Sequence, residues 1–133
     1  MANYKLPYYK GYIDLNIPDD EVAGVLVSKT ESYVPKLSEE ELVREALNNP
    51  IASMPLCDLA ISKKHIVIIS SDHTRPVPSH ITMPILLEEI RKKNPNVKIT
   101  ILIATGMHRP TTHEELVNKY GLKIVDEEEI IIH

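Results

Sequence analysis

Two apolar segments in the second half of the chain have the residue pattern of strands in a parallel sheet. Residues 65–70 and 97–104 are nearly continuous β-branched runs, which is typical of strands buried on both faces. Between them, residues 81–93 place apolar side chains at helical spacing, and we place Pro84 in the first turn of that helix, where its missing N–H costs little. The pattern therefore predicts a strand, a helix and a second strand.

A further helix and further strands follow. Residues 112–115 form a capping box, so we expect a helix to begin there and to run to Tyr120, with Gly121 as the residue that ends it. Residues 124–125 and 130–132 are candidate strands. The βαβαβ order predicts a parallel, Rossmann-like sheet in a three-layer α/β fold, with ligands bound beyond the carboxyl ends of the strands.

The N-terminal part of the chain predicts a strand pair and a helix. Residues 11–17 alternate apolar and polar side chains, as a half-buried strand does. Residues 22–27 form a second apolar run, and together the two runs favour a hairpin. Ser38 opens another capping box with Glu41, and Asn48-Asn49-Pro50 ends the helix that follows.

Composition places the chain among ordinary globular proteins. Its 133 residues are 43% hydrophobic and 26% charged, which suits one domain with a core of its own. The 15 Lys and Arg against 19 Asp and Glu give a net charge of −4, which offers no basic footprint for nucleic acid or an anionic membrane. Cys57 is the single cysteine, and this fits a reducing compartment. We therefore expect a cytoplasmic protein without a signal peptide, a membrane span or a nucleic-acid partner.

The first candidate site follows the strand predicted at residues 65–70. An acid, an imidazole, a hydroxyl and a guanidinium stand there in succession, as Asp72, His73, Thr74 and Arg75. The planar fork of Arg75 suits a carboxylate or a phosphate. The structural alternative is that Asp72 and Thr74 only cap a turn, with Arg75 paired to Asp72 on the surface.

The second candidate site follows the strand predicted at residues 97–104. Gly106 lets the backbone turn off the strand, His108 is a natural general acid and base near neutral pH, and Arg109 adds a second fork for an anion. The helix that begins near Thr112 offers free N–H groups to an anion. The structural alternative is a hydrogen-bonded turn histidine and a solvated arginine.

Other familiar chemical motifs do not occur in the sequence. The 6 histidines form neither an H-E-x-x-H pair nor a Cys/His zinc spacing, and we assign no residue as a metal ligand. G-x-S-x-G, G-x-G-x-x-G and Walker A sequences are also lacking. An ordinary serine hydrolase, dinucleotide or ATP site is therefore not predicted.

The two loops together resemble the signatures of one enzyme family. Asp72-His73-Thr74-Arg75-Pro76 resembles the D-x-T-R-P signature of the nickel-pincer-nucleotide-dependent lactate racemase family, and Gly106-Met107-His108-Arg109-Pro110-Thr111 resembles its G-x-H-R-x-x-T signature. Residues 38–55 also look like part of the N-terminal domain of that family. The resemblance covers essentially the whole chain.

The resemblance implies a longer enzyme with two α/β domains and an active site between them. Its cofactor would be a nickel-pincer nucleotide, a nickel pyridinium-3,5-bisthiocarboxylic acid mononucleotide, which accepts hydride from C2 of a 2-hydroxy acid. His108 would be one of two histidines that remove and return the hydroxyl proton. Arg75 would bind the substrate carboxylate through its guanidinium, and the guanidinium of Arg109 would be a second substrate-binding group. The cofactor would contact Asp72, His73, Thr74 and Arg75.

Three functional residues of the family match no position in residues 1–133. They are the second acid/base histidine, the lysine that carries the cofactor and the histidine that binds nickel. We therefore expect residues 1–133 to be an N-terminal domain, a fragment of a two-domain enzyme that needs its C-terminal domain for turnover. Two alternatives stay open: a non-catalytic module that binds an anion or nucleotide through Arg75 and Arg109, and a structural domain whose loops only pack against a partner domain.

Overall fold

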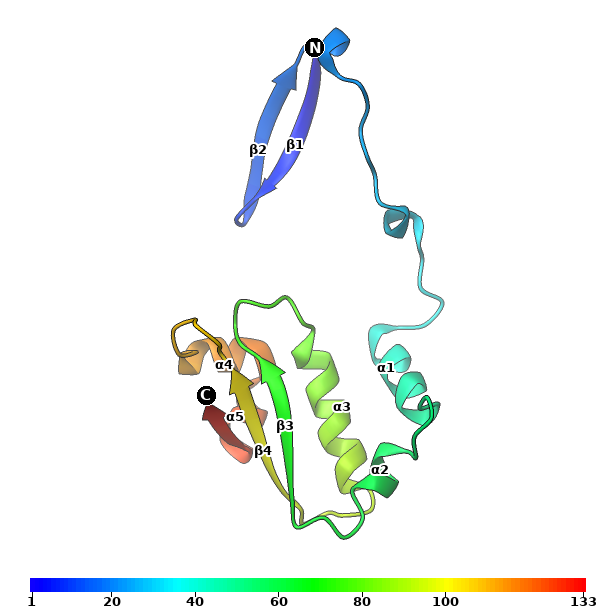
Figure 1. The fold of residues 1–133 in the computed structure, drawn as a ribbon, viewed down its shortest axis with the longest axis vertical. Coiled ribbons are helices and arrows are strands. Elements are labelled where there is room, and N and C mark those ends of the chain that lie inside the picture. The colour runs from blue at the N-terminus through cyan, green and yellow to red at the C-terminus, as the bar shows by residue number, and fades with distance from the viewer. The chain divides into compact units, whose positions relative to one another are not determined.

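The computed structural model describes residues 1–133 and divides the chain into two compact units, Met1–Pro35 and Lys36–His133. Figure 1 labels the helices and strands of each unit except β5, the short strand that ends near the C-terminus. None of the helices is both long enough and apolar enough to cross a membrane. In chain order, the elements are β1 (Ala2–Tyr8), β2 (Gly11–Ile17), α1 (Glu39–Asn48), α2 (Leu56–Leu59), β3 (His65–Ser71), α3 (Ser79–Arg91), β4 (Lys98–Ala104), α4 (His113–Tyr120), α5 (Leu122–Glu127) and β5 (Glu129–Ile132), with short 3₁₀ turns at Asp19–Glu21 and Lys29–Ser32.

The first unit contains an antiparallel hairpin. β1 and β2 pair along their whole length and are joined by Tyr9 and Lys10, with Tyr9 at a φ of 53°. The predicted strand pair is confirmed, and residues 11–17 form one of its strands. The prediction of the other strand at residues 22–27 is wrong, because these residues form no strand and β1 takes that place. A two-residue connection is the commonest hairpin loop, and it pairs residues 11–17 with the segment just before them.

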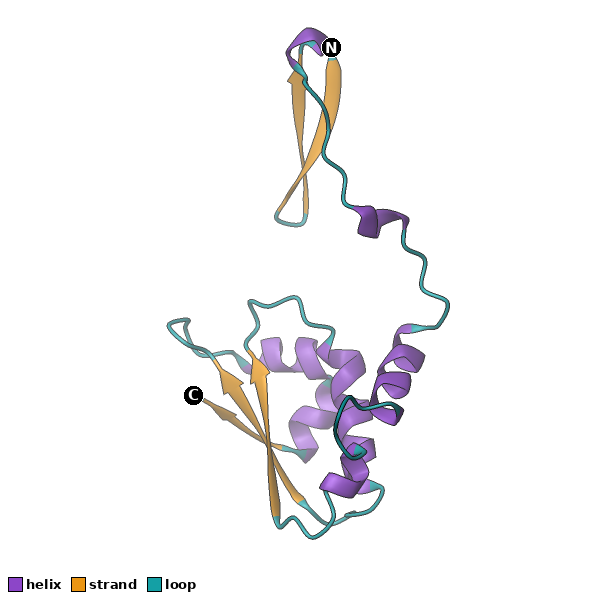
Figure 2. Ribbon diagram, turned by 45° about the vertical axis from the view of Figure 1, so that its right-hand side comes forward, coloured by secondary structure: helices purple, strands orange, loops and turns teal.

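The second unit contains a parallel sheet in the order β3-β4-β5, which confirms the predicted α/β fold with a βαβαβ unit. Both crossover connections lie on the same side of the sheet (Figure 2), as right-handed crossovers require when successive strands are added in one direction. Ser71 pairs with Ala104. The loops after β3 and β4 therefore begin side by side.

The core lies between the sheet and the helices. Ile101 and Ile103 of β4 are fully buried. Helical residues complete the core from α3, α4 and α5, namely Met83, Leu87, Ile90, Leu116, Tyr120 and Ile124.

The opposite face of the sheet is open within residues 36–133. Ile69, Leu102 and Ile131 stand in register across it, and Ile69 is 73% exposed. The expectation that β3 is buried on both faces is therefore wrong for this unit. The third layer of the predicted three-layer fold would have to cover this face.

Two local predictions are also wrong. α3 begins at Ser79 rather than Ile81, so Pro84 lies in the second turn and leaves the carbonyl of His80 without its helical partner. Residues 124–125 belong to α5 rather than to a strand, because Gly121 ends α4 at a φ of 87° and a new helix begins directly after it. The capping boxes at Ser38 and Thr112 do start α1 and α4, as predicted.

Candidate functional site

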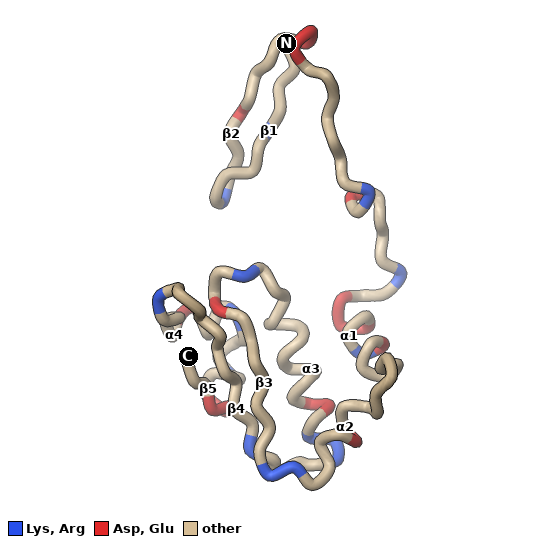
Figure 3. Tube along the Cα trace, viewed as in Figure 1, with Lys and Arg blue, Asp and Glu red and all other residues tan.

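The candidate site is built on the two loops that leave the carboxyl ends of β3 and β4. Each loop carries a basic position (Figure 3). The loop after β4 begins with a four-residue turn, in which the His108 amide donates to the Thr105 carbonyl over 3.1 Å. Gly106 is the first central residue of this turn, with a φ of 60°, which is a conformation that favours glycine. The turn brings His108 back toward the first loop.

Asp72 is a buried carboxylate with three hydrogen bonds from its surroundings. Its side chain is 2% exposed. Its Oδ1 accepts from the Thr74 hydroxyl over 2.6 Å and from the Thr74 amide over 3.1 Å, and its Oδ2 lies 2.5 Å from Nδ1 of His108. The Thr74 hydroxyl and His108 hold the pKa of Asp72 well below its usual range, although burial opposes this. Asp72 is therefore ionised at neutral pH.

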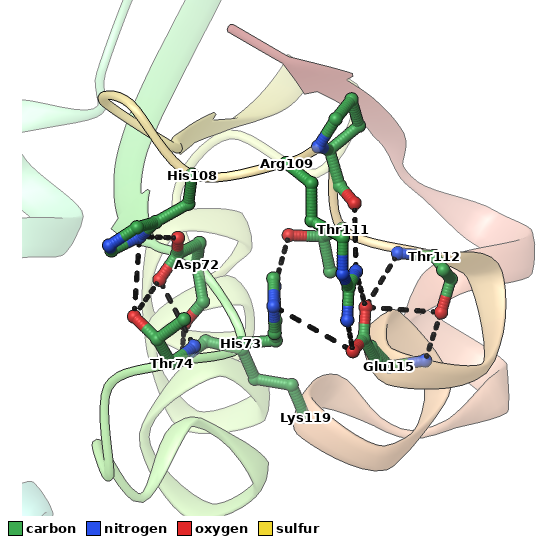
Figure 4. Close-up of polar contacts among 10 residues, drawn as sticks. Asp72, His73, Thr74, His108, Arg109, Thr111, Thr112, Glu115 and Lys119 are labelled. Carbon is green, nitrogen blue, oxygen red and sulfur yellow. Dashed lines mark hydrogen bonds and ion pairs between the residues drawn. The ribbon is translucent and has the colours of Figure 1, made fainter.

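The charge of Asp72 settles which nitrogen of His108 carries the proton in the neutral ring. An ionised carboxylate can only accept hydrogen bonds, so Nδ1 of His108 must donate to it. The lone pair of the neutral ring then lies on Nε2, which points away from Asp72 (Figure 4). The His108 side chain is 45% exposed. This nitrogen can therefore exchange a proton with a bound molecule.

Arg109 is held by a carboxylate of α4. Its guanidinium makes a bidentate pair with Glu115 over 2.6 and 2.9 Å, and Glu115 also accepts from the Thr112 amide over 2.8 Å in the capping box. Arg109, and after it Thr112, lower the pKa of Glu115 to about 2. The fork of Arg109 is therefore engaged within the chain, and its assignment to substrate stays a prediction.

His73 connects the two loops on the side away from His108 (Figure 4). Its Nδ1 lies 3.1 Å from the hydroxyl of Thr111, which is buried. Its Nε2 lies 3.7 Å from Glu115. The predicted site residues of the first loop thus divide, because Asp72 and Thr74 gather around His108 while His73 belongs to the Glu115 cluster.

Lys119 of α4 is a site residue that the sequence analysis did not identify. Its Nζ donates to the carbonyl of Asp72 over 3.0 Å, and it lies 3.4 Å from the Ser71 hydroxyl and 3.5 Å from the Arg75 carbonyl. Burial lowers its pKa, although the charge of Asp72 opposes this. Glu115 and Lys119 are four residues apart, so one face of α4 holds both loops. No local motif marks this arrangement, because Lys119 is separated from Asp72 by 47 residues.

Among the titratable side chains of the predicted site, Arg75 alone lies in no ion pair. The other three arginines, Arg44, Arg91 and Arg109, each pair with a glutamate. The alternative in which Arg75 pairs with Asp72 is wrong, because the charged partner of Asp72 is His108. An exposed guanidinium beside a buried carboxylate–imidazole pair is suited to an anionic ligand.

No three His, Cys, Asp or Glu residues gather into a group that could hold a metal ion. The groups that could bind a cofactor are the guanidinium of Arg75, the hydroxyl of Thr74 and the imidazole of His73. These groups suit the anionic part of a nucleotide.

Comparison with known proteins relates the chain to one family. The family described as "Lactate racemase N-terminal domain" matches residues 8–133. Lactate racemases from Thermoanaerobacterium thermosaccharolyticum and Lactiplantibacillus plantarum are 52% and 57% identical to the chain over 133 residues. These matches cover 100% of the chain and 31% of each relative.

A solved structure supports the same relationship. The lactate racemase apoprotein from Thermoanaerobacterium thermosaccharolyticum matches with a TM-score of 0.85 and 50% sequence identity. The match covers 99% of this chain and 30% of that one. The chain thus spans about a third of the length of the relatives that it matches.

Proposed function

The chain belongs to the lactate racemase N-terminal domain family, and from this membership we propose that it is the N-terminal part of a two-domain racemase or epimerase of 2-hydroxy acids. The observation that carries the proposal is the pair of buried Asp72 and half-exposed His108, 2.5 Å apart at the carboxyl end of the sheet. Racemisation through a 2-keto intermediate needs a group that takes the hydroxyl proton as C2 loses hydride. His108 is placed to be that group.

His108 acts through Nε2 in this proposal. In the neutral ring Nε2 accepts the hydroxyl proton, and the imidazolium that results is stabilised by ionised Asp72 through Nδ1. The same nitrogen would then return the proton to the substrate oxygen. Asp72 fixes the ring orientation and the tautomer, as the aspartate of a Ser-His-Asp triad does. Thr74 keeps Asp72 ionised and in place.

Arg75 holds the carboxylate of the hydroxy acid. A guanidinium binds a carboxylate through two parallel hydrogen bonds. Arg75 forms no ion pair with a glutamate or aspartate of the chain, whereas Arg109 is paired with Glu115. Arg109 instead fixes the second loop on α4, and it would reach substrate only by leaving Glu115.

The cofactor in this proposal is the nickel-pincer nucleotide. When bound, it supplies the hydride acceptor for C2 of the substrate. The residues of this chain that would contact it are Asp72, His73, Thr74 and Arg75. The nickel-binding histidine and the lysine that carries the cofactor would come from the C-terminal domain, so residues 1–133 alone would not turn over substrate.

The test is racemisation by the full-length parent loaded with cofactor. We expect His108→Ala to lower the turnover of both D- and L-hydroxy acids by about 10²-fold or more. His113→Ala is the matched control, because His113 is an exposed histidine five positions along, at the start of α4. Turnover that survives His108→Ala at the level of His113→Ala would exclude the proposed role.

A further inference from the structure

The N-terminal unit, residues 1–35, has no core of its own. None of its residues is buried, and its two 3₁₀ turns bury no side chain either. A two-stranded hairpin is marginally stable at best in water, because it buries too little apolar surface to offset the loss of chain entropy. The fold of this unit therefore depends on an occupant that covers its apolar surface.

The two faces of the hairpin differ in chemistry. Residues directly opposite each other in an antiparallel pair lie on the same face, and successive residues alternate between the faces. One face is apolar and is formed by three pairs, Ala2 with Ile17, Tyr4 with Leu15 and Leu6 with Ile13. The other face is polar and includes the pairs Asn3 with Asn16 and Lys5 with Asp14. This alternation is typical of a strand pair that packs one face on a core and turns the other to water.

The apolar face is open within residues 1–35. Leu6 is 47% exposed and Ile13 is 49% exposed. Residues 22–26 share a hollow with this face, but they add exposed apolar side chains instead of covering it, since Val25 and Leu26 are themselves exposed. We call Leu6, Ile13, Leu15, Val25 and Leu26 the hairpin surface. A contiguous exposed apolar patch of this kind marks a contact with other protein.

The length of the relatives favours an occupant from the same polypeptide. The chain covers 31% of each relative, so most of the parent protein follows the matched part. Such an occupant is present at an effective concentration that does not depend on the protein concentration, whereas a second copy would make the fold of residues 1–35 concentration-dependent. The hairpin surface carries no charged side chain, which suits a permanent contact better than a transient one steered by charge.

We propose that the hairpin surface is the docking site for the part of the parent protein that follows residue 133. The apolar face of β1 and β2 then lies in the interior of the whole protein, while Lys5 and Asp14 face water. The proposal rests on that part of the proposed function in which the chain is the N-terminal portion of a longer enzyme. It does not rest on the chemistry assigned to His108.

Hydrogen exchange, followed by mass spectrometry in the 133-residue chain and in the full-length parent, tests the proposal. We expect the amides of residues 2–17 to exchange at least about 10²-fold more slowly in the parent, because docking adds to the free energy of opening the hairpin. Peptides from β4, which carries the fully buried Ile101 and Ile103, should be protected in both proteins. The 133-residue chain is measured at a low and a high concentration, so that self-association would be seen as added protection.

Two adjacent substitutions on opposite faces locate the contact. Leu6→Thr and Lys5→Thr both introduce a residue that suits a strand, but only Leu6 belongs to the apolar face. In the parent, Leu6→Thr should speed the exchange of residues 2–17 by about 10-fold or more, since it removes apolar area from the contact. Lys5→Thr is the matched control and should leave the exchange unchanged.

Three results would overturn the proposal: equal protection of residues 2–17 in the two proteins, protection in the 133-residue chain that grows with its concentration, or equal exchange of Leu6→Thr and Lys5→Thr in the parent. The second result would identify a second copy as the occupant. The parent carrying His108→Ala should protect the hairpin as the unmodified parent does. Loss of the docking contact and loss of the racemase chemistry are therefore measured separately.

Discussion

Asp72 is the most deeply buried carboxylate of the site, and the hydrogen bonds to its side chain all favour its charged form. Thr74 donates twice to one oxygen, His108 donates to the other, and Lys119 holds the carbonyl of the same residue. Burial alone would raise the pKa of a carboxyl group, so these contacts are what keep Asp72 ionised. At the scale of single residues, the ring orientation and the tautomer of His108 depend on this one buried charge.

Asp72→Asn is the substitution that separates this charge from the shape of the side chain. The amide can still accept from Thr74, but its NH₂ group can donate to Nδ1 of His108 and so place the ring proton on Nε2. In the full-length parent we expect turnover to fall by about 10²–10⁴-fold, with little change in KM. Asp58→Asn, which removes a carboxylate paired with Lys93 outside the loops, is the control. Normal turnover in folded Asp72→Asn enzyme would contradict the assignment.

At the scale of elements, α4 is the helix that holds both loops of the site in place. Its capping box is visible in the sequence at Thr112 and Glu115, and the helix starts where the motif predicts. What the motif does not reveal is that Glu115 also binds Arg109, or that Lys119 reaches the first loop. Those contacts depend on how α4 packs against the sheet, which local sequence does not encode.

The same distinction explains which other parts of the site could be predicted. The sequence predicts where the two loops lie because the carboxyl ends of parallel strands meet at one edge of the sheet, and the pairing of Ser71 with Ala104 brings the loops together. The hydrogen bond between Asp72 and His108 joins residues 36 apart and depends on side-chain geometry, so composition and spacing could not supply it. The predicted burial of β3 on both faces is wrong for residues 36–133, since an apolar run indicates a covered strand but not which residues cover it.

The role of Glu115 leads to a prediction about pH and stability. Arg109 and Thr112 lower the pKa of Glu115 from 4.5 to about 2, so the folded state binds fewer protons than the unfolded state between these values. The stabilisation by Glu115 is therefore complete above pH 4.5 and is lost as the pH falls toward 2.

Urea unfolding of the 133-residue chain from pH 2 to pH 7 tests this prediction. Glu115→Gln should lower the free energy of unfolding most above pH 5, and the difference from the unmodified chain should shrink toward pH 2. Between pH 4.5 and pH 2, the unmodified chain should take up about one more proton on unfolding than the variant does. Glu114→Gln, at an exposed neighbour without a hydrogen bond, should leave the slope unchanged. A pH-independent effect of Glu115→Gln would contradict the assignment.

At the scale of the whole molecule, the two faces of the sheet differ in what covers them. On one face Ile68 packs against the core formed with the helices. On the other, Ile69, Leu102 and Ile131 form an apolar row that no helix of residues 36–133 covers (Figure 2). The chain spans 31% of the length of its relatives, and we expect the rest of the proposed enzyme to cover this row.

Two adjacent threonine substitutions test this arrangement, because each keeps the β-branched shape that suits a strand. In the 133-residue chain, Ile69→Thr should change the free energy of unfolding by less than about 0.5 kcal/mol, as exposed substitutions do. Ile68→Thr should cost about 1–3 kcal/mol, since it places a hydroxyl against the core. In the full-length parent, both substitutions should destabilise by about 1–3 kcal/mol, which urea unfolding of the four proteins measures. If Ile69→Thr is neutral in the parent as well, the rest of the enzyme does not cover this face, and the open side of the sheet needs another occupant.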